Sequence, residues 1–139
     1  MPERYRDLAQ AFLQHGEPLL AHDVVAEAIP RWPDDVRLRQ LLGLALARSG
    51  ATERAQQIFD RLLDEGQADE ETFGILGRLQ KDFAARASNV AEQTAHWRQA
   101  KQYYEKAYRV SRGIWSGINA ATMNLLIGQH EEAARLAQA

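Results

Sequence analysis

The sequence predicts an all-α protein built from repeated helix pairs, and three observations lead to this prediction. Apolar residues recur at three- and four-residue spacing, which is the spacing of one face of an α-helix. Short segments such as HGEP, RSGAT and EGQAD interrupt these apolar stripes, as turns do. The pattern also returns after 34 residues, and a fixed period of this size is typical of stacked helical repeats.

We expect one domain of four repeats that forms part of a larger protein. The repeats span about 2–35, 36–69, 70–113 and 114–139. The first two set the period, because Gly16 aligns with Gly50 and Val25 aligns with Phe59. The turn segments HGEP and RSGAT divide each of these repeats into two helices.

Two glycines fall inside predicted helices, where a glycine costs about 1 kcal/mol relative to alanine. They are Gly43 and Gly77, at equivalent positions of the second and third repeats. We expect two helix backbones to pass closely at these glycines. The small residues Ala21, Ala55 and Ala100 would provide the facing surfaces.

The third repeat contains an insertion of about 11 residues, because the match to Ala55 is Ala100, which is displaced by 45 residues. Asn89 is placed as a helix N-cap with Glu92 three positions later, so the insertion is expected to be helical. It would lengthen both helices of the third hairpin by about five or six residues each, adding about 1.5 Å per residue. A loose loop at 84–91 is the alternative.

Glycines at the ends of first helices have a different role. A glycine there can adopt the left-handed conformation that closes a helix without a Cβ penalty. We expect this of Gly16, Gly50 and Gly128. The fourth repeat stops before its second helix is complete. Either the chain is a piece of a longer protein, or Leu125, Ile127, Leu136 and neighbouring alanines would be buried against a second copy or another domain.

The repeat resembles the tetratricopeptide repeat (TPR), whose pattern is Leu-Gly, a second Gly seven residues later, then Ala, an aromatic residue, Ala and Pro. Pro33 occupies the terminal proline position of the first repeat. Ala9 replaces the mid-helix glycine of that repeat, and Gln67 replaces the proline of the second. The resemblance implies a right-handed superhelix in which each repeat packs against its neighbours.

The second half also resembles the TRAF-binding regulatory region of the apoptosis signal-regulating kinases and its bacterial relatives. Three motifs carry this resemblance, at Gly77 to Asp82, Tyr103 to Tyr108 and Gly117 to Asn119. It implies a regulatory helical-repeat segment of a larger signalling protein. It does not imply that TRAF proteins are the partner, and no kinase signature occurs in the chain.

Composition argues against several other classes of protein. The formal net charge of −2 does not favour nucleic-acid binding, which needs a basic face. The chain has no cysteine for disulfides or zinc, and no apolar run long enough to span a membrane. The amino-terminal residues lack the apolar core of a signal peptide, so we expect a cytoplasmic protein.

No set of residues supports catalysis, a metal or a cofactor. His15 and His22 are separated by a turn, so one helix cannot present both. The segment HEEAA at 130–134 lacks the second histidine of the metalloprotease motif. The serines fall near helix ends, where hydroxyl groups cap or turn the chain. We therefore expect a non-catalytic protein.

The first helices of TPR-like repeats line a concave groove, and the candidate partner-binding residues follow from their repeat positions. They are Arg37, Gln40, Arg48, Arg78, Lys81, Trp115, Ile118 and Asn119. The cationic members make this groove locally basic, which suits an acidic peptide or a terminal carboxylate. Trp115 and Ile118 would provide an apolar anchor.

Two plainer readings of the groove remain open. Arginines on helices are commonly paired with acids three or four residues away, and Asn119 could be a structural hydrogen-bonding residue. The sequence predicts a regulatory or scaffolding protein-interaction module that binds a peptide segment or a neighbouring domain. The alternative is a structural oligomerisation or interdomain spacer element, with self-association through the C-terminal helix.

Overall fold

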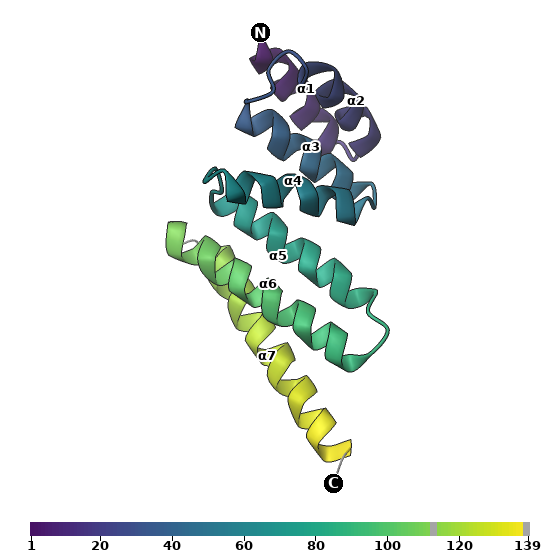
Figure 1. Cartoon of the computed structure of the whole chain (residues 1–139), viewed down its shortest axis with the longest axis vertical. Coiled ribbons are helices and arrows are strands. Elements are labelled where there is room, and N and C mark those ends of the chain that lie inside the picture. The colour runs from purple at the N-terminus through teal and green to yellow at the C-terminus, as the bar shows by residue number, and fades with distance from the viewer. Residues whose placement is uncertain (112–113, 138–139) are drawn as a thin grey trace. The chain divides into compact units, whose positions relative to one another are not determined.

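The structure is a computed structural model that describes the backbone of residues 1–111 and 114–137 and the side chains of residues 1–110 and 118–131. The described backbone forms seven α-helices and no strand, which confirms the all-α prediction (Figure 1). The helices are α1 (Pro2–Gln14), α2 (Pro18–Ala28), α3 (Val36–Arg48), α4 (Thr52–Asp64), α5 (Glu70–Ala85), α6 (Val90–Ser111) and α7 (Ile114–Ala137).

The helices belong to two compact parts of the chain. The N-terminal half, Met1–Ala68, contains α1 to α4, and the C-terminal half, Asp69–Ala139, contains α5 to α7. None of the described helices is both long and apolar enough to span a lipid bilayer.

The N-terminal half consists of two antiparallel helix pairs, α1 with α2 and α3 with α4, and α2 also packs against α3 (Figure 1). Its core contains Ala9, Val25 and Leu41, which are fully buried. Gly16 and Gly50 have positive φ angles of 74° and 90° at the ends of α1 and α3. The predicted helix-closing role of these two glycines is therefore confirmed.

The mid-helix glycines face aromatic rings, and this corrects the expectation of two close backbones. A β-carbon built on Gly43 would lie 2.5 Å from the Phe59 ring, and one on Gly77 would lie 2.8 Å from the Tyr104 ring. Each ring comes from the second helix of the same pair. The glycine therefore makes room for an aromatic side chain, which packs directly on the helix backbone.

The C-terminal half contains the elongated hairpin of the third repeat. With 16 residues, α5 is only slightly longer than α3, which has 13, whereas α6 has 22 residues. The insertion is thus helical, but it lengthens α6 far more than α5. The loop offered as an alternative at 84–91 is shorter than expected and spans only 86–89, because α5 ends at Ala85 and α6 begins at Val90.

The predicted cap of α6 is confirmed. The Asn89 side chain accepts a hydrogen bond from the Glu92 backbone N–H at 2.8 Å. The Glu92 carboxylate in turn accepts from the Ser88 backbone N–H at 3.3 Å. These two bonds satisfy backbone donors at and just before the start of α6, so this helix begins at a fixed residue.

The predicted turn at Gly128 is wrong, because α7 continues through this residue to Ala137. The fourth repeat therefore contributes one long helix instead of a helix pair. The elongated α6 provides the physical reason. Trp97 of α6 packs its ring against His130 at 4.4 Å, and Arg98 forms an ion pair with Glu131. Residues beyond Gly128 thus find partners along α6 if α7 continues straight.

Candidate functional site

The first helices of the N-terminal half, α1 and α3, lie side by side and parallel. Arg6 of α1 donates a hydrogen bond to Asp35 at the start of α3, with 3.0 Å between the atoms. Arg48 at the end of α3 donates to the Leu13 carbonyl at the end of α1, also at 3.0 Å. An arginine side chain therefore joins α1 to α3 at each end. The two helices form a single surface, which we call the α1/α3 surface.

Asp35 has two roles in this arrangement. It is the N-cap of α3, and its side chain accepts a hydrogen bond from the Leu38 backbone N–H at 2.9 Å. The same carboxylate pairs with Arg6, which also contacts Glu3 at 3.3 Å. The start of α3 is thus held both by its own cap and by α1.

Three predicted site residues lie on α3. Arg37 donates a hydrogen bond to Gln40 at 3.3 Å, so the structure brings these two residues together. Gln40 is buried, and Arg37 is half-buried. Arg48 is engaged with the Leu13 carbonyl, which gives this predicted binding residue a structural role as well.

Two predicted site residues, Arg78 and Lys81, lie one turn apart on α5 of the C-terminal half. Burial raises the pKa of Tyr104 to about 12; the positive charge of Arg78 opposes this rise, and the negative charge of Asp82 adds to it. The tyrosine hydroxyl is therefore neutral over the physiological pH range. Arg78 is exposed, and Lys81 is half-buried.

The remaining predicted residues belong to α7. Ile118 is 52% exposed, and Asn119 is half-buried. Thr122 donates a hydrogen bond to the Ile118 carbonyl at 2.9 Å, one turn back along the helix. Trp115, predicted as an apolar anchor, and Leu136 lie outside the described side chains.

Aromatic and histidine contacts join the helices of the C-terminal half. His96 of α6 lies 2.8 Å from the Gln80 side-chain oxygen of α5 and stacks on Phe83 at 5.5 Å. No sequence pattern indicates His96 as a contact residue, because a lone histidine carries no repeat signal. Among the described residues, no group of three or more histidine, aspartate or glutamate side chains is arranged to hold a metal ion.

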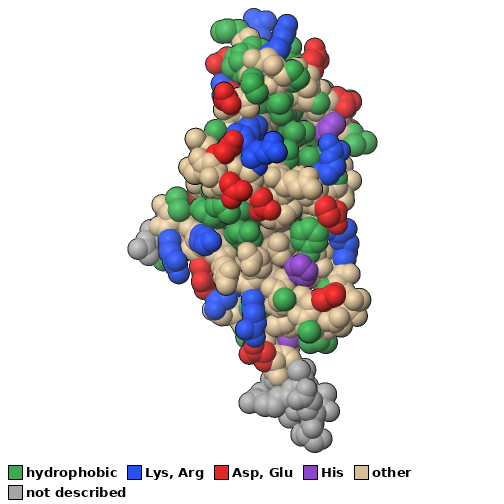
Figure 2. All heavy atoms as spheres, in the orientation of Figure 1, with side chains coloured by type: hydrophobic (Ala, Val, Ile, Leu, Met, Phe, Trp, Pro, Cys, Tyr) green, Lys and Arg blue, Asp and Glu red, His purple; other side chains and the backbone are tan. Residues whose placement is uncertain are grey.

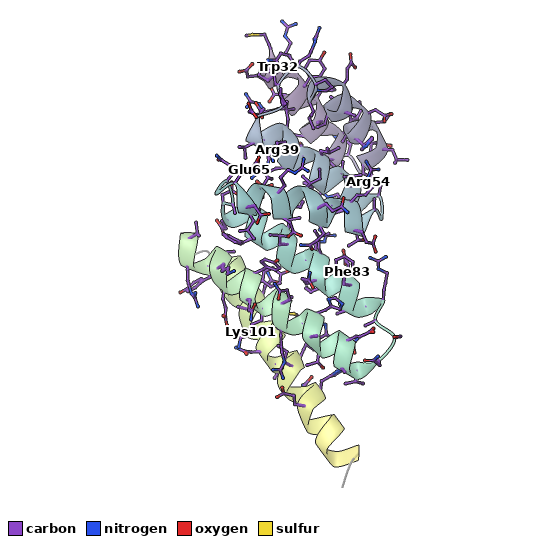
Figure 3. The ribbon with its side chains drawn as sticks, viewed as in Figure 1. Trp32, Arg39, Arg54, Glu65, Phe83 and Lys101 are labelled. Atoms are coloured by element: carbon purple, nitrogen blue, oxygen red, sulfur yellow. The ribbon has the colours of Figure 1, made fainter. Side chains whose placement is uncertain are left out.

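A pocket of about 450 Å³ in the N-terminal half was not predicted. It is lined by Ile29, Pro33, Asp34, Arg39, Leu42, Gln57, Ile58, Arg61 and Glu65. Figure 3 shows Arg39 and Glu65 beside one another, and their side chains form an ion pair. These two residues are 26 positions apart, so no local pattern in the sequence signals the pocket.

The surface carries both signs of charge. On the face shown in Figure 2, acidic and basic side chains are interspersed over the described residues. This distribution agrees with the formal net charge of −2. Any charge preference of a binding site must therefore come from a few local residues.

Comparison with known proteins identifies the repeat type. The profile of the family described as "Tetratricopeptide Repeats-Sensor" (TPR-S) matches residues 18–124. No curated protein matches the chain. Two solved structures share its fold with a TM-score of 0.54 and 18% sequence identity over 96% of this chain. They are "MamA RS-1 ArsTM double mutant" and "MamA 41-end from Desulfovibrio magneticus RS-1", of which 88% and 89% are covered.

Proposed function

Because the chain belongs to the TPR-S family of tetratricopeptide repeat proteins, we propose that it is a non-catalytic protein-interaction module. It binds a peptide segment or a neighbouring domain through its first helices and has a regulatory or scaffolding role in the cytoplasm. The family is described as a sensor, which supports a regulatory role. The resemblance to the regulatory region of the apoptosis signal-regulating kinases supports the same role.

The observation that carries this proposal is the fixed position of α1 beside α3. The Arg6–Asp35 and Arg48–Leu13 bonds hold the two helices at both ends, so a ligand meets a surface that is already formed. Preorganisation of this kind lowers the entropy cost of binding. Arg37 lies in the first turn of α3 and offers a guanidinium to an acidic side chain or a terminal carboxylate.

In the C-terminal half, Arg78 and Lys81 of α5 supply the corresponding positive charges. Ile118 of α7 supplies exposed apolar area, and Asn119 supplies a polar contact. Trp115 adds an apolar anchor in this proposal. A ligand of the C-terminal half is thus expected to combine acidic and apolar positions.

The experiment is affinity capture from an extract of the native cells with the wild-type chain and two charge-reversal variants. Arg37→Glu changes the α1/α3 surface, and it keeps α3 stable because a negative charge is favourable near a helix N-terminus. Arg54→Glu is the control, since Arg54 lies on the second helix α4 and its side chain is exposed to solvent (Figure 3). Circular dichroism checks that both variants retain their helices.

A protein captured by the wild type and by Arg54→Glu, but lost with Arg37→Glu, would support the proposal and identify the ligand. Arg78→Glu then tests the C-terminal half in the same way. Equal capture by all variants would overturn binding through the first helices. Equal capture together with self-association would favour the alternative, a structural oligomerisation or spacer element.

A further inference from the structure

The pocket in the N-terminal half is formed by residues of three helices. Ile29 lies at the end of α2, Leu42 lies on α3 and Ile58 lies on α4, and all three side chains line the pocket. Each of them is half-buried. Both α2 and α4 pack against α3. Three aliphatic side chains therefore meet in the pocket, and we call them the aliphatic wall.

The loop between α2 and α3, which carries Asp34, is held in place. The Trp32 ring packs against the Tyr5 ring of α1 with 5.6 Å between the ring centroids, and the Trp32 backbone N–H donates a hydrogen bond to the Ala28 carbonyl at 3.1 Å. The Asp35 backbone N–H donates to the Trp32 carbonyl at 3.2 Å. This side of the pocket is thus formed before a ligand arrives, which lowers the entropy cost of binding.

Four charged side chains line the pocket, two of each sign. Arg39 of α3 and Glu65 at the end of α4 form an ion pair (Figure 3), in which the arginine side chain is only 14% exposed. Arg61 and Asp34 are exposed, and their side chains form no hydrogen bond or ion pair with the residues that the structure describes. One cation and one anion of the pocket are therefore available to a ligand without breaking the Arg39–Glu65 pair.

The balance of charge indicates the class of ligand. The two guanidinium groups and the two carboxylates cancel, so the lining has no net charge. An anion that pairs with Arg61 would share the pocket with the carboxylates of Asp34 and Glu65, and a cation that pairs with Asp34 would share it with two arginines. Like charges brought together in this way weaken binding. A zwitterion meets both Arg61 and Asp34 with the opposite charge.

The volume and the aliphatic wall narrow the class of ligand further. At about 450 Å³ the pocket lies within the range of small-molecule sites, about 300–1,000 Å³. A ligand side chain that covers the aliphatic wall removes apolar surface from water, which favours binding. Among the described lining residues there is no aromatic ring, so an aromatic ligand would gain no stacking.

We propose that this pocket binds a free aliphatic α-amino acid such as leucine. The ligand carboxylate accepts hydrogen bonds from the Arg61 guanidinium, its ammonium group pairs with Asp34, and its side chain packs on the aliphatic wall. This site is separate from the α1/α3 surface, because Arg37 and Arg39 are two residues apart on α3 and point about 200° apart around the helix axis. The amino acid and the partner protein of the proposed function therefore have different sites.

The test is a titration of the ¹⁵N-labelled chain with L-leucine, followed by the amide shifts of residues 29–42 and 57–65. Three analogues are titrated in the same way. Leucinamide lacks the carboxylate, 4-methylpentanoate lacks the ammonium group, and leucyl-leucine moves the two charges further apart. Arg61→Gln and Asp34→Asn remove the proposed contacts. Arg54→Gln is the matched control, because Arg54 is an exposed arginine of the same helix that does not line the pocket (Figure 3).

L-Leucine should bind at least about tenfold more tightly than each analogue, because each analogue loses or misplaces one charge-assisted contact. Arg61→Gln should weaken leucine binding to the same degree and should not weaken leucinamide binding. Asp34→Asn should weaken leucine binding and should not weaken 4-methylpentanoate binding. Arg54→Gln should leave the binding of all four compounds unchanged. The spectrum of each variant without ligand shows that it remains folded.

Three results would overturn the proposal. The first is the absence of leucine-dependent shifts at the pocket amides. The second is binding of 4-methylpentanoate or leucyl-leucine as tight as that of leucine, because the site would then take a simple carboxylate or a peptide. The third is an equal loss of leucine binding in Arg54→Gln and Arg61→Gln, which would indicate a general effect of charge. Capture of a partner protein is tested at Arg37, so failure of one proposal leaves the other intact.

Discussion

The Phe59 ring occupies the space above Gly43, where the nearest ring carbon would lie 2.5 Å from an added β-carbon. Tyr104 and Gly77 repeat this relationship in the third repeat, at 2.8 Å. Each pair joins the first and second helices of one repeat. The absence of a side chain at the glycine is thus what allows an aromatic residue to pack between the two helices.

Gly43→Ala should destabilise the protein by about 1–3 kcal/mol, since the new methyl group overlaps a ring in a closely packed core. The gain in helix propensity, about 1 kcal/mol, is too small to offset this cost. Urea unfolding measures the change. Gly74→Ala is the control: an added β-carbon there meets no atom within 4 Å, so the variant should be more stable by about 0.5–1 kcal/mol.

A second substitution checks the cause of the Gly43→Ala effect. Phe59→Leu in the Gly43→Ala background should recover part of the lost stability, because the smaller side chain leaves room for the methyl group. Simple additivity of the two single changes would contradict direct contact between residues 43 and 59.

Tyr104 should make the protein less stable as the pH rises from 10 to 12. The pKa of this side chain is about 12 in the folded chain and 10.0 for an ordinary tyrosine, mainly because it is buried. Between these pH values the unfolded chain binds fewer protons than the folded chain, so the free energy of unfolding falls. The loss is at most about 2–3 kcal/mol from this group.

Two measurements check the behaviour of Tyr104. Tyrosinate absorbance should show that one of the four tyrosines ionises later than an ordinary tyrosine. Tyr104→Phe should remove this late step and reduce the loss of stability between pH 10 and 12. An unchanged pH dependence in this variant would contradict the assignment.

Asp35→Ala should destabilise the protein by about 1–2 kcal/mol, because it removes the N-cap of α3 and the partner of Arg6. Thermal or urea unfolding measures the change. Asp34→Ala is the neighbouring control, and its effect should stay within about 0.5 kcal/mol because Asp34 is exposed. Similar effects of the two substitutions would argue against the cap.

Two glycines that align in the repeat should respond to alanine in opposite ways. Gly50 has a φ of 90°, so Gly50→Ala should destabilise the protein by about 1 kcal/mol. Gly128 lies inside α7 with open space around it, so Gly128→Ala should stabilise by up to about 1 kcal/mol. Destabilisation by Gly128→Ala would indicate a turn at this residue.

The repeat period was sufficient to predict the all-α fold, the first three helix pairs and the helix-closing roles of Gly16 and Gly50. These features depend on local patterns, namely apolar spacing and turn residues, that a sequence displays directly. The cap at Asn89 belongs to the same class, because its partner Glu92 lies only three residues away.

The candidate site depended much more on tertiary contacts. The sequence indicated Arg48 as a groove residue, but only the folded chain joins Arg48 to the Leu13 carbonyl, 35 residues away. The pocket beside Arg39 and Glu65 also arises from residues far apart in the chain. Such contacts leave no periodic signal.

The sequence by itself determined the type of repeat and the number of residues in its period. Only the tertiary structure decided what faces each glycine and where the last helix ends. Gly128 matches Gly50 in sequence, yet α7 passes through it because the elongated α6 offers Trp97 and Arg98 as partners beyond that point. A glycine permits a turn, but whether the chain takes it depends on the contacts that a continued helix can make.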